Sequence, residues 1–110
     1  MSEARLPAHL EVAAIMRAAE AAGGFAVVLA RGERDAGAIL ICTRERDGAM
    51  GLWERRPSLD GVRSFHPITL PVNDSHVDDY LDRRRRQDPD LWQIEVDIAQ
   101  AERFVAKLGT

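Results

Sequence analysis

Four consecutive arginines are the first residues in this chain whose type and spacing could do chemistry. A guanidinium binds phosphate through two hydrogen bonds, so such a run could hold nucleic acid or a phosphate ligand. The surrounding segment 74–90 also carries six aspartates, which outnumber the four arginines. The spacing pairs Asp79 with Arg83 on a helix, and Asp82 with Arg86, which favours a solvated, self-neutralised helix. The alternative of nucleic-acid or phosphate-ligand binding rests on Arg83, Arg84, Arg85 and Arg86.

A second candidate combines aromatic and arginine side chains on two expected strands, 50–55 and 62–68. Because strand residues two apart share a face, the first strand presents Trp53 beside Arg55. The second strand can add an arginine and a phenylalanine on that face. Such a combination is typical of a ligand or partner surface, although the same face could instead form a second core layer under a helix. The candidate surface consists of Trp53, Arg55, Arg63 and Phe65.

A third candidate is a small enzyme pocket near Glu54, Arg63 and His66. The chain contains no phosphate-binding glycine loop, no nucleophile elbow and no zinc-protease motif. Its three histidines are scattered and have no cysteine or acidic residue at metal spacing. We therefore expect no catalytic residues, no metal site and no cofactor, and the balance favours a protein that is not an enzyme.

The composition restricts the partners and the compartment. A net charge of −3 argues against nucleic-acid binding by bulk electrostatics. Cys42 is the only cysteine and lies in an apolar run, so a buried, inert thiol is expected. The charged N-terminus lacks the apolar core of a secretory signal, and no apolar run is long enough to cross a membrane. We expect a cytoplasmic protein with no membrane association.

These candidates must be positioned by secondary-structure elements that glycine, proline and apolar periodicity delimit. Segments 25–31 and 38–43 are apolar on both sides, which predicts central strands covered on both faces. Asp47-Gly48 predicts a hairpin, and short links favour antiparallel strands. In the arginine-rich helix, the face predicted to pack on the sheet carries Val77, Tyr80, Leu81 and Arg84. In the last strand, Trp92, Ile94, Val96 and Ile98 are predicted to point inward, and Leu91, Gln93, Glu95 and Asp97 outward.

The expected fold is a single α+β domain over residues 1–110, with a mainly antiparallel sheet of about five strands packed with three helices. The predicted order is α-β-β-β-β-α-β-α. The predicted elements are a helix 7–22, strands 25–31, 38–43, 50–55 and 62–68, a helix 75–87, a strand 91–98 and a helix 98–108.

With these residues described, the chain resembles an uncharacterised family of small bacterial proteins, one of the domains of unknown function. Three segments carry the resemblance: Arg5-Leu6, the turn Asp35-Ala36-Gly37-Ala38, and residues 80–96 with their block Asp88-Pro89-Asp90-Leu91-Trp92. The resemblance spans nearly the whole chain and implies one small cytoplasmic domain. It implies no activity and no site residue.

The sequence leads to one main interpretation of function. The missing catalytic motifs and the two-sided apolar strands predict a non-enzymatic binding or protein-interaction module. Its expected partner is a second copy of the chain, which would bind through a sheet edge or through the Trp53 and Phe65 face. Nucleic-acid or phosphate binding and a small enzyme site remain the alternatives.

Overall fold

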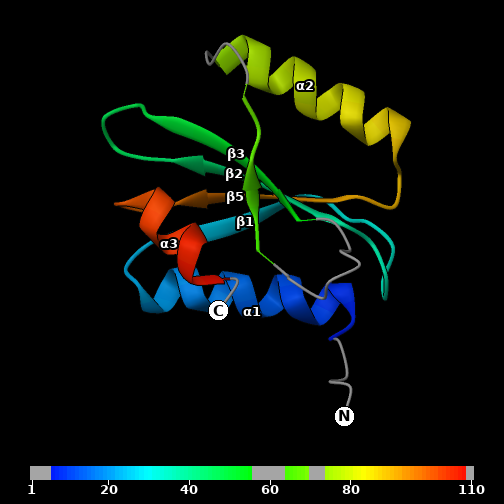
Figure 1. Cartoon of the computed structure of the whole chain (residues 1–110), viewed down its shortest axis with the longest axis horizontal. Helices are drawn as coiled ribbons and strands as arrows, with labels where there is room; N and C mark the ends of the chain where they lie inside the picture. Colours follow the sequence, from blue (N-terminus) through cyan, green and yellow to red (C-terminus); the bar gives the residue numbers. More distant parts are fainter. Residues whose placement is uncertain (1–5, 56–63, 70–73, 109–110) are drawn as a thin grey trace.

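The computed structural model describes residues 6–55, 64–69 and 74–108, and it contains a five-stranded sheet and three helices (Figure 1). The element order α-β-β-β-β-α-β-α and the α+β class confirm the predictions. The elements are α1 (Ala8–Ala21), β1 (Phe25–Ala30), β2 (Ile39–Arg44), β3 (Met50–Arg55), β4 (His66–Pro67), α2 (Asp74–Gln87), β5 (Trp92–Asp97) and α3 (Ala101–Leu108).

The strand order is β1-β5-β2-β3-β4, so the last strand of the chain lies between the first two. β5 runs antiparallel to β1 and parallel to β2, whereas β2–β3 and β3–β4 are antiparallel. A parallel neighbour requires a crossover connection, and the long return from β3 to β5 carries α2. The sheet is therefore mostly antiparallel, as predicted.

Helices lie on both faces of this sheet, with α1 and α2 on opposite sides (Figure 1). One core joins α1 and the start of α3 to inward residues of β2 and β5, including Ile41 and Ile94. The other core joins α2 to the opposite face through Leu40, Leu52 and Val77. Burial of Val77 and Leu81 confirms the predicted packing face of α2. Among the described helices, none is long and apolar enough to cross a bilayer.

The prediction that the first strand is central is wrong, because β5 takes the inner position and leaves β1 at the sheet edge. The side chains of Phe25, Val27 and Leu29 are 55%, 47% and 39% exposed. Ala26, Val28 and Ala30, which alternate with them, are less exposed. The strand has one covered and one open face, although its sequence shows no alternation of polarity.

Three further boundaries or orientations differ from the predictions. Leu91 and Gln93 are buried and not outward-facing, because α2 covers that face of β5; Gln93 Nε2 donates a hydrogen bond to the Leu81 carbonyl at 2.9 Å. The last helix begins at Ala101 and not at residue 98, since Gln100 adopts a left-handed φ of 54° just before it. Of the predicted strand 62–68, residues 62–63 lie outside the described residues, and 66–67 form β4.

Candidate functional site

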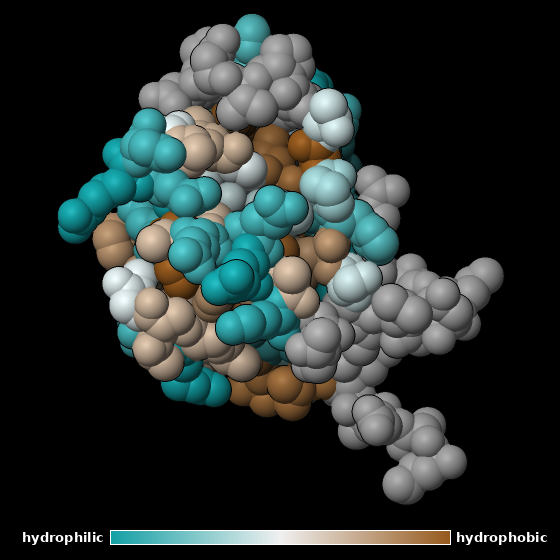
Figure 2. Space-filling view, turned by 60° about the vertical axis from the view of Figure 1, so that its left-hand side comes forward, coloured by the Kyte–Doolittle hydropathy of each residue, from teal (hydrophilic) through white to brown (hydrophobic). Residues whose placement is uncertain are grey.

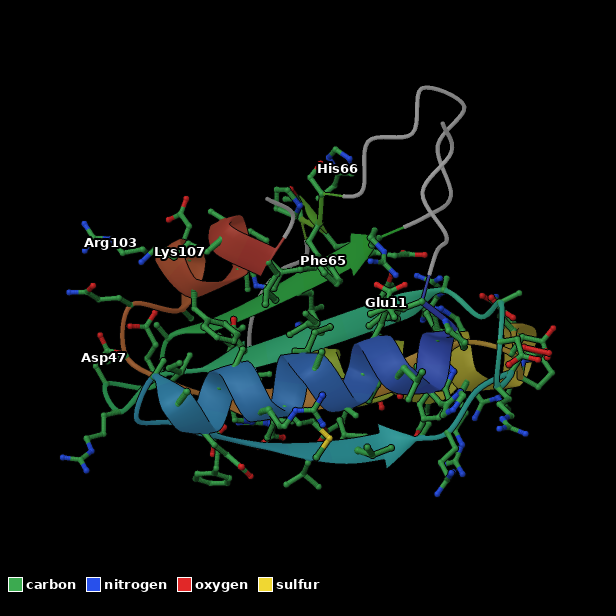
Figure 3. The ribbon with its side chains drawn as sticks, turned by 90° about the horizontal axis from the view of Figure 1, so that it is seen from below. Glu11, Asp47, Phe65, His66, Arg103 and Lys107 are labelled. Carbon is green, nitrogen blue, oxygen red and sulfur yellow. The ribbon has the colours of Figure 1, made fainter. Side chains whose placement is uncertain are left out.

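Three of the four residues in the predicted aromatic and arginine surface lie close together. The guanidinium of Arg55 is 5.5 Å from the centre of the Phe65 ring, and Trp53 and Phe65 both pack against the core that α1 helps to form. Trp53 Nε1 donates a hydrogen bond to Thr43 Oγ1 at 3.1 Å, and Arg55 forms a largely buried ion pair with Glu11 of α1. Glu11 and Phe65 lie on the α1 side of the strands, whereas His66 points outward (Figure 3). Arg63 is outside the described residues.

The predicted arginine run does not form one surface. Arg84 Nη1 and Nη2 donate to the two carboxylate oxygens of Glu54 at 2.8 and 2.9 Å, and Nη1 also donates to Tyr80 Oη at 2.7 Å. These hydrogen bonds raise the pKa of Arg84, so it stays fully charged. Arg83 lies over the Tyr80 ring, and Arg85 and Arg86 are exposed. The pair between Arg84 and Glu54 instead attaches α2 to β3.

The same ion pair occupies the carboxylate of the predicted enzyme pocket. Glu54 and His66 are directly opposite each other in the β3–β4 ladder. Glu54 is only 6% exposed and binds Arg84, while His66 is exposed. Arg63, the third member, is outside the described residues. In the described part of the chain, no cluster of His, Cys, Asp and Glu side chains is suited to hold a metal ion.

The free edge of β1 is the feature that sequence reasoning missed. In the described residues, five large apolar side chains are exposed, and three of them, Phe25, Val27 and Leu29, belong to this strand. α1 packs against the other face of β1 and leaves their side uncovered (Figure 3). No local signal marked this open face, because the segment FAVVLA is apolar at every position. We call Phe25, Val27 and Leu29 the β1 stripe.

Two carboxyl groups of β5 lie next to the β1 stripe. Glu95 is directly opposite Val27, and Asp97 is directly opposite Phe25. Arg44 of β2 places its Nε 3.3 Å from Glu95 Oε1. Burial raises the pKa of Glu95; the nearby Arg44 opposes this rise, and Asp97 adds to it by repulsion and by hydrogen bonding. Asp97 Oδ1 is buried and has no hydrogen-bond partner in the described part of the chain.

Cys42 lies opposite Glu95 in β2 and is buried, as predicted. Burial, together with nearby carboxylates, raises the pKa of its thiol to about 11, against a weaker opposing effect of Arg44. A thiol with such a pKa is almost entirely protonated at neutral pH and is a poor nucleophile. Cys42 is therefore a neutral neighbour of the carboxyl pair.

A cavity of about 610 Å³ opens where β2 and β5 end, beside the start of β1. Its side of the molecule, which carries the β2–β3 hairpin, is mostly hydrophilic with small hydrophobic areas between (Figure 2). Glu45 lies in the wall of this cavity, and its Oε1 accepts a hydrogen bond from the backbone N–H of Gln100 at 3.2 Å. The lining mixes both charge signs with apolar residues, so it defines no single ligand class. It consists of Gly23, Gly24, Phe25, Arg44, Glu45, Arg46, Asp97, Ile98 and Ala99.

Comparison with known proteins finds one family and several solved structures. The family described as "Protein of unknown function (DUF1491)" matches residues 6–106. The solution structure of protein Atu0922 from A. tumefaciens is 32% identical, with a TM-score of 0.80 over 94% of each chain. The crystal structure of a DUF1491 protein from Caulobacter crescentus is also 32% identical, with a TM-score of 0.80 over 91% of this chain and 94% of that one.

An NMR structure of a DUF1491 protein from Caulobacter crescentus is 31% identical, with a TM-score of 0.81 over 94% of each chain. No curated protein matches the chain. The similarity therefore covers nearly the full length of the fold and brings no assigned activity.

Proposed function

Because the chain belongs to the DUF1491 family, whose function is unknown, we propose its function from its geometry: a non-enzymatic interaction module that forms a homodimer through β1. The observation that carries this proposal is the β1 stripe on the free edge of the sheet. An edge strand has unpaired N–H and C=O groups that can continue the ladder into another chain. The composition and the single buried cysteine support a cytoplasmic location.

The β1 stripe is complementary to itself. In an antiparallel pair, residues directly opposite each other point to the same face, so a two-fold axis between two copies must pass through a residue. With the axis at Val27, Val27 meets Val27 of the second copy and Phe25 meets Leu29 of the second copy. Every exposed apolar side chain of the β1 stripe then has an apolar cross-strand neighbour, an arrangement that stabilises sheets.

The charges at the ends of β1 support the same pairing. An axis at Val27 places Arg31 of one copy opposite Gly23 of the other, just beyond the end of α1. That helix end carries Glu20, and its last turn has no basic residue. The carboxyl end of a helix carries partial negative charge, so an arginine from the second copy is favourable there.

The proposed assembly also stops at two copies. In the proposed dimer, the β1 edge of each copy is covered by β1 of the other copy. The other edge strand of each sheet, β4, is only two residues long. A register shift between Val28 and Ala30 marks a bulge that limits the regular ladder. A closed dimer is therefore favoured over an extended fibre.

The other surfaces stay predictions of lower priority. Arg55 and Arg84 are held in ion pairs with Glu11 and Glu54, so their charges are already compensated. A partner surface at Trp53, Arg55, Arg63 and Phe65 and an anionic-ligand surface at the arginine run stay predictions. Among the described residues of both surfaces, no large apolar side chain is exposed as in the β1 stripe.

Sedimentation equilibrium of matched variants tests the homodimer. We expect the wild-type protein to be dimeric and Val27→Lys to be monomeric, because lysine charges would meet across the axis. Leu10→Lys is the control, since Leu10 is 45% exposed on α1, close to the 47% of Val27. Circular dichroism confirms that both variants fold. A monomeric wild-type protein, or a dimeric Val27→Lys variant, would overturn the proposal.

A further inference from the structure

We propose that Glu95 and Asp97 share one proton and that this carboxyl pair makes the association through β1 dependent on pH. The inference deepens the proposed homodimer and rests on it for the coupling between proton and partner. The proton site itself follows from the geometry of β5 and its neighbours, independently of any dimer.

Strand geometry brings the two carboxyl groups together. Glu95 and Asp97 are two residues apart in β5, so they point to the same face of the sheet. Arg44 follows the same face in β2, where it is directly opposite Asp97 while its Nε contacts Glu95. The guanidinium of Arg44 therefore contacts one carboxyl group of the pair, that of Glu95.

The unpaired oxygen of Asp97 indicates the proton. Asp97 Oδ1 is buried without a hydrogen-bond donor in the described residues. Two ionised carboxylates can only accept hydrogen bonds, whereas a protonated carboxyl can donate one. A proton on Glu95, donated to Asp97, supplies the missing donor. With this proton, the cluster of Arg44, Glu95 and Asp97 carries one positive and one negative charge. Without it, the cluster carries one positive and two negative charges.

The surroundings of the pair favour the shared proton. On the β1 side it meets only the apolar Phe25 and Val27. On the β2 side it meets Arg44 and the neutral Cys42. Glu45 and Arg46 line the same cavity as Asp97, and the charge of Asp78 in α2 acts on Cys42. Burial and the neighbouring Asp97 raise the pKa of Glu95, and Arg44 only partly opposes this.

The cross-strand positions couple the proton to the proposed interface. Glu95 is the direct neighbour of Val27, through which the proposed two-fold axis passes. A second copy over the β1 stripe would exclude water from this side of Glu95, and loss of water disfavours the ionised form further. Association therefore takes up protons, and by linkage a lower pH strengthens association.

Dimer dissociation constants at about pH 5 and about pH 8 test the coupling. If association raises the pKa of Glu95 by one unit, each subunit contributes a factor of about ten to the rise in the wild-type dissociation constant between the lower and the higher pH. Glu95→Gln should keep a tight dimer at both values. Glu102→Gln, an exposed carboxylate of α3, is the control and should keep the wild-type dependence. A dimer whose affinity is independent of pH, or a Glu95→Gln dimer that still weakens at high pH, would overturn the coupling.

Carboxyl NMR titration of Val27→Asn, a neutral variant that weakens the dimer without placing a charge opposite Glu95, tests the proton site on the monomer separately. We expect Glu95 to titrate above the usual glutamate range, and Asp97→Asn to lower the pKa of Glu95. A Glu95 that titrates in the usual glutamate range, or whose titration Asp97→Asn leaves unchanged, would overturn the shared proton. Absence of a dimer at every pH would instead overturn the proposed function and its coupling, while this titration still decides on the proton site.

Discussion

Arg84 in α2 and Glu54 in β3 form a two-point ion pair, with nitrogen–oxygen distances of 2.8 and 2.9 Å. Glu54 is almost completely buried beneath the helix, and Tyr80 Oη accepts a further hydrogen bond from the same guanidinium. The pair fixes the position of a helix whose apolar face is narrow. An arginine from the most basic segment of the chain therefore acts as a structural contact.

We expect Arg84→Ala to lower the free energy of unfolding by about 3 kcal/mol, because it removes the guanidinium that binds both oxygens of the buried Glu54 carboxylate. Urea unfolding followed by circular dichroism measures this. Arg85→Ala removes an exposed arginine from the same helix and should change stability by less than about 0.5 kcal/mol. Equal effects of the two substitutions would contradict the structural role of Arg84.

The hydrogen bond from Trp53 to Thr43 should make a measurable contribution to stability. A double-mutant cycle of Trp53→Phe and Thr43→Val should give a coupling energy of about 1 kcal/mol, the typical net contribution of one such hydrogen bond. Chemical denaturation of the two single variants and the double variant supplies the numbers. Additive single effects would show that the indole and the hydroxyl do not interact.

Cysteine cross-linking should reveal the register of the proposed dimer. Val27→Cys should cross-link to itself with a short thiol-specific reagent, since opposite side chains in a sheet are about 5 Å apart. Phe25→Cys and Leu29→Cys should cross-link efficiently only when the two variants are mixed. The native Cys42 does not interfere because it is buried. Efficient linkage of Phe25→Cys to itself would indicate a different axis.

The stability of the Val27→Asn variant, measured as a monomer, should fall as the pH rises above about 4.5, the unperturbed pKa of Glu95. The sign follows from the raised pKa of Glu95 in the folded state. Folding favours the neutral form of Glu95. The resulting stabilisation is complete below the pKa of Glu95 in the unfolded state and is lost as the pH rises through its pKa in the folded state. Urea unfolding across this range measures the effect. In the Val27→Asn, Glu95→Gln double variant this part of the pH dependence should disappear.

Local signals in the sequence were sufficient to place most elements. Gly23-Gly24 and Asp47-Gly48 mark chain reversals, and the periodicity of residues 74–87 gave the buried face of α2, including Arg84. The partner of Arg84 was not predictable, since Glu54 is thirty residues away and no local pattern joins them. Long-range pairing is decided by the whole fold.

The misplacement of β1 has a similar cause. The segment FAVVLA lacks charged residues, so polarity alone suggested that both faces were covered. Its edge position depends on β5, more than sixty residues later in the chain, which inserts beside it. Glu95 and Asp97 were predicted to point outward. This prediction missed their burial because the burial depends on the insertion of β5 between β1 and β2.

The insertion of β5 also restricts how the protein can fold during synthesis. β1 and β2 leave the ribosome early, but they are not neighbours in the sheet. Both pair with residues 92–97. The sheet therefore cannot form in its native order until residues 92–97 have been made. Until then the apolar strands lack their central partner, so we expect the chain to fold only after β5 has left the ribosome and to be sensitive to chaperone supply before that point.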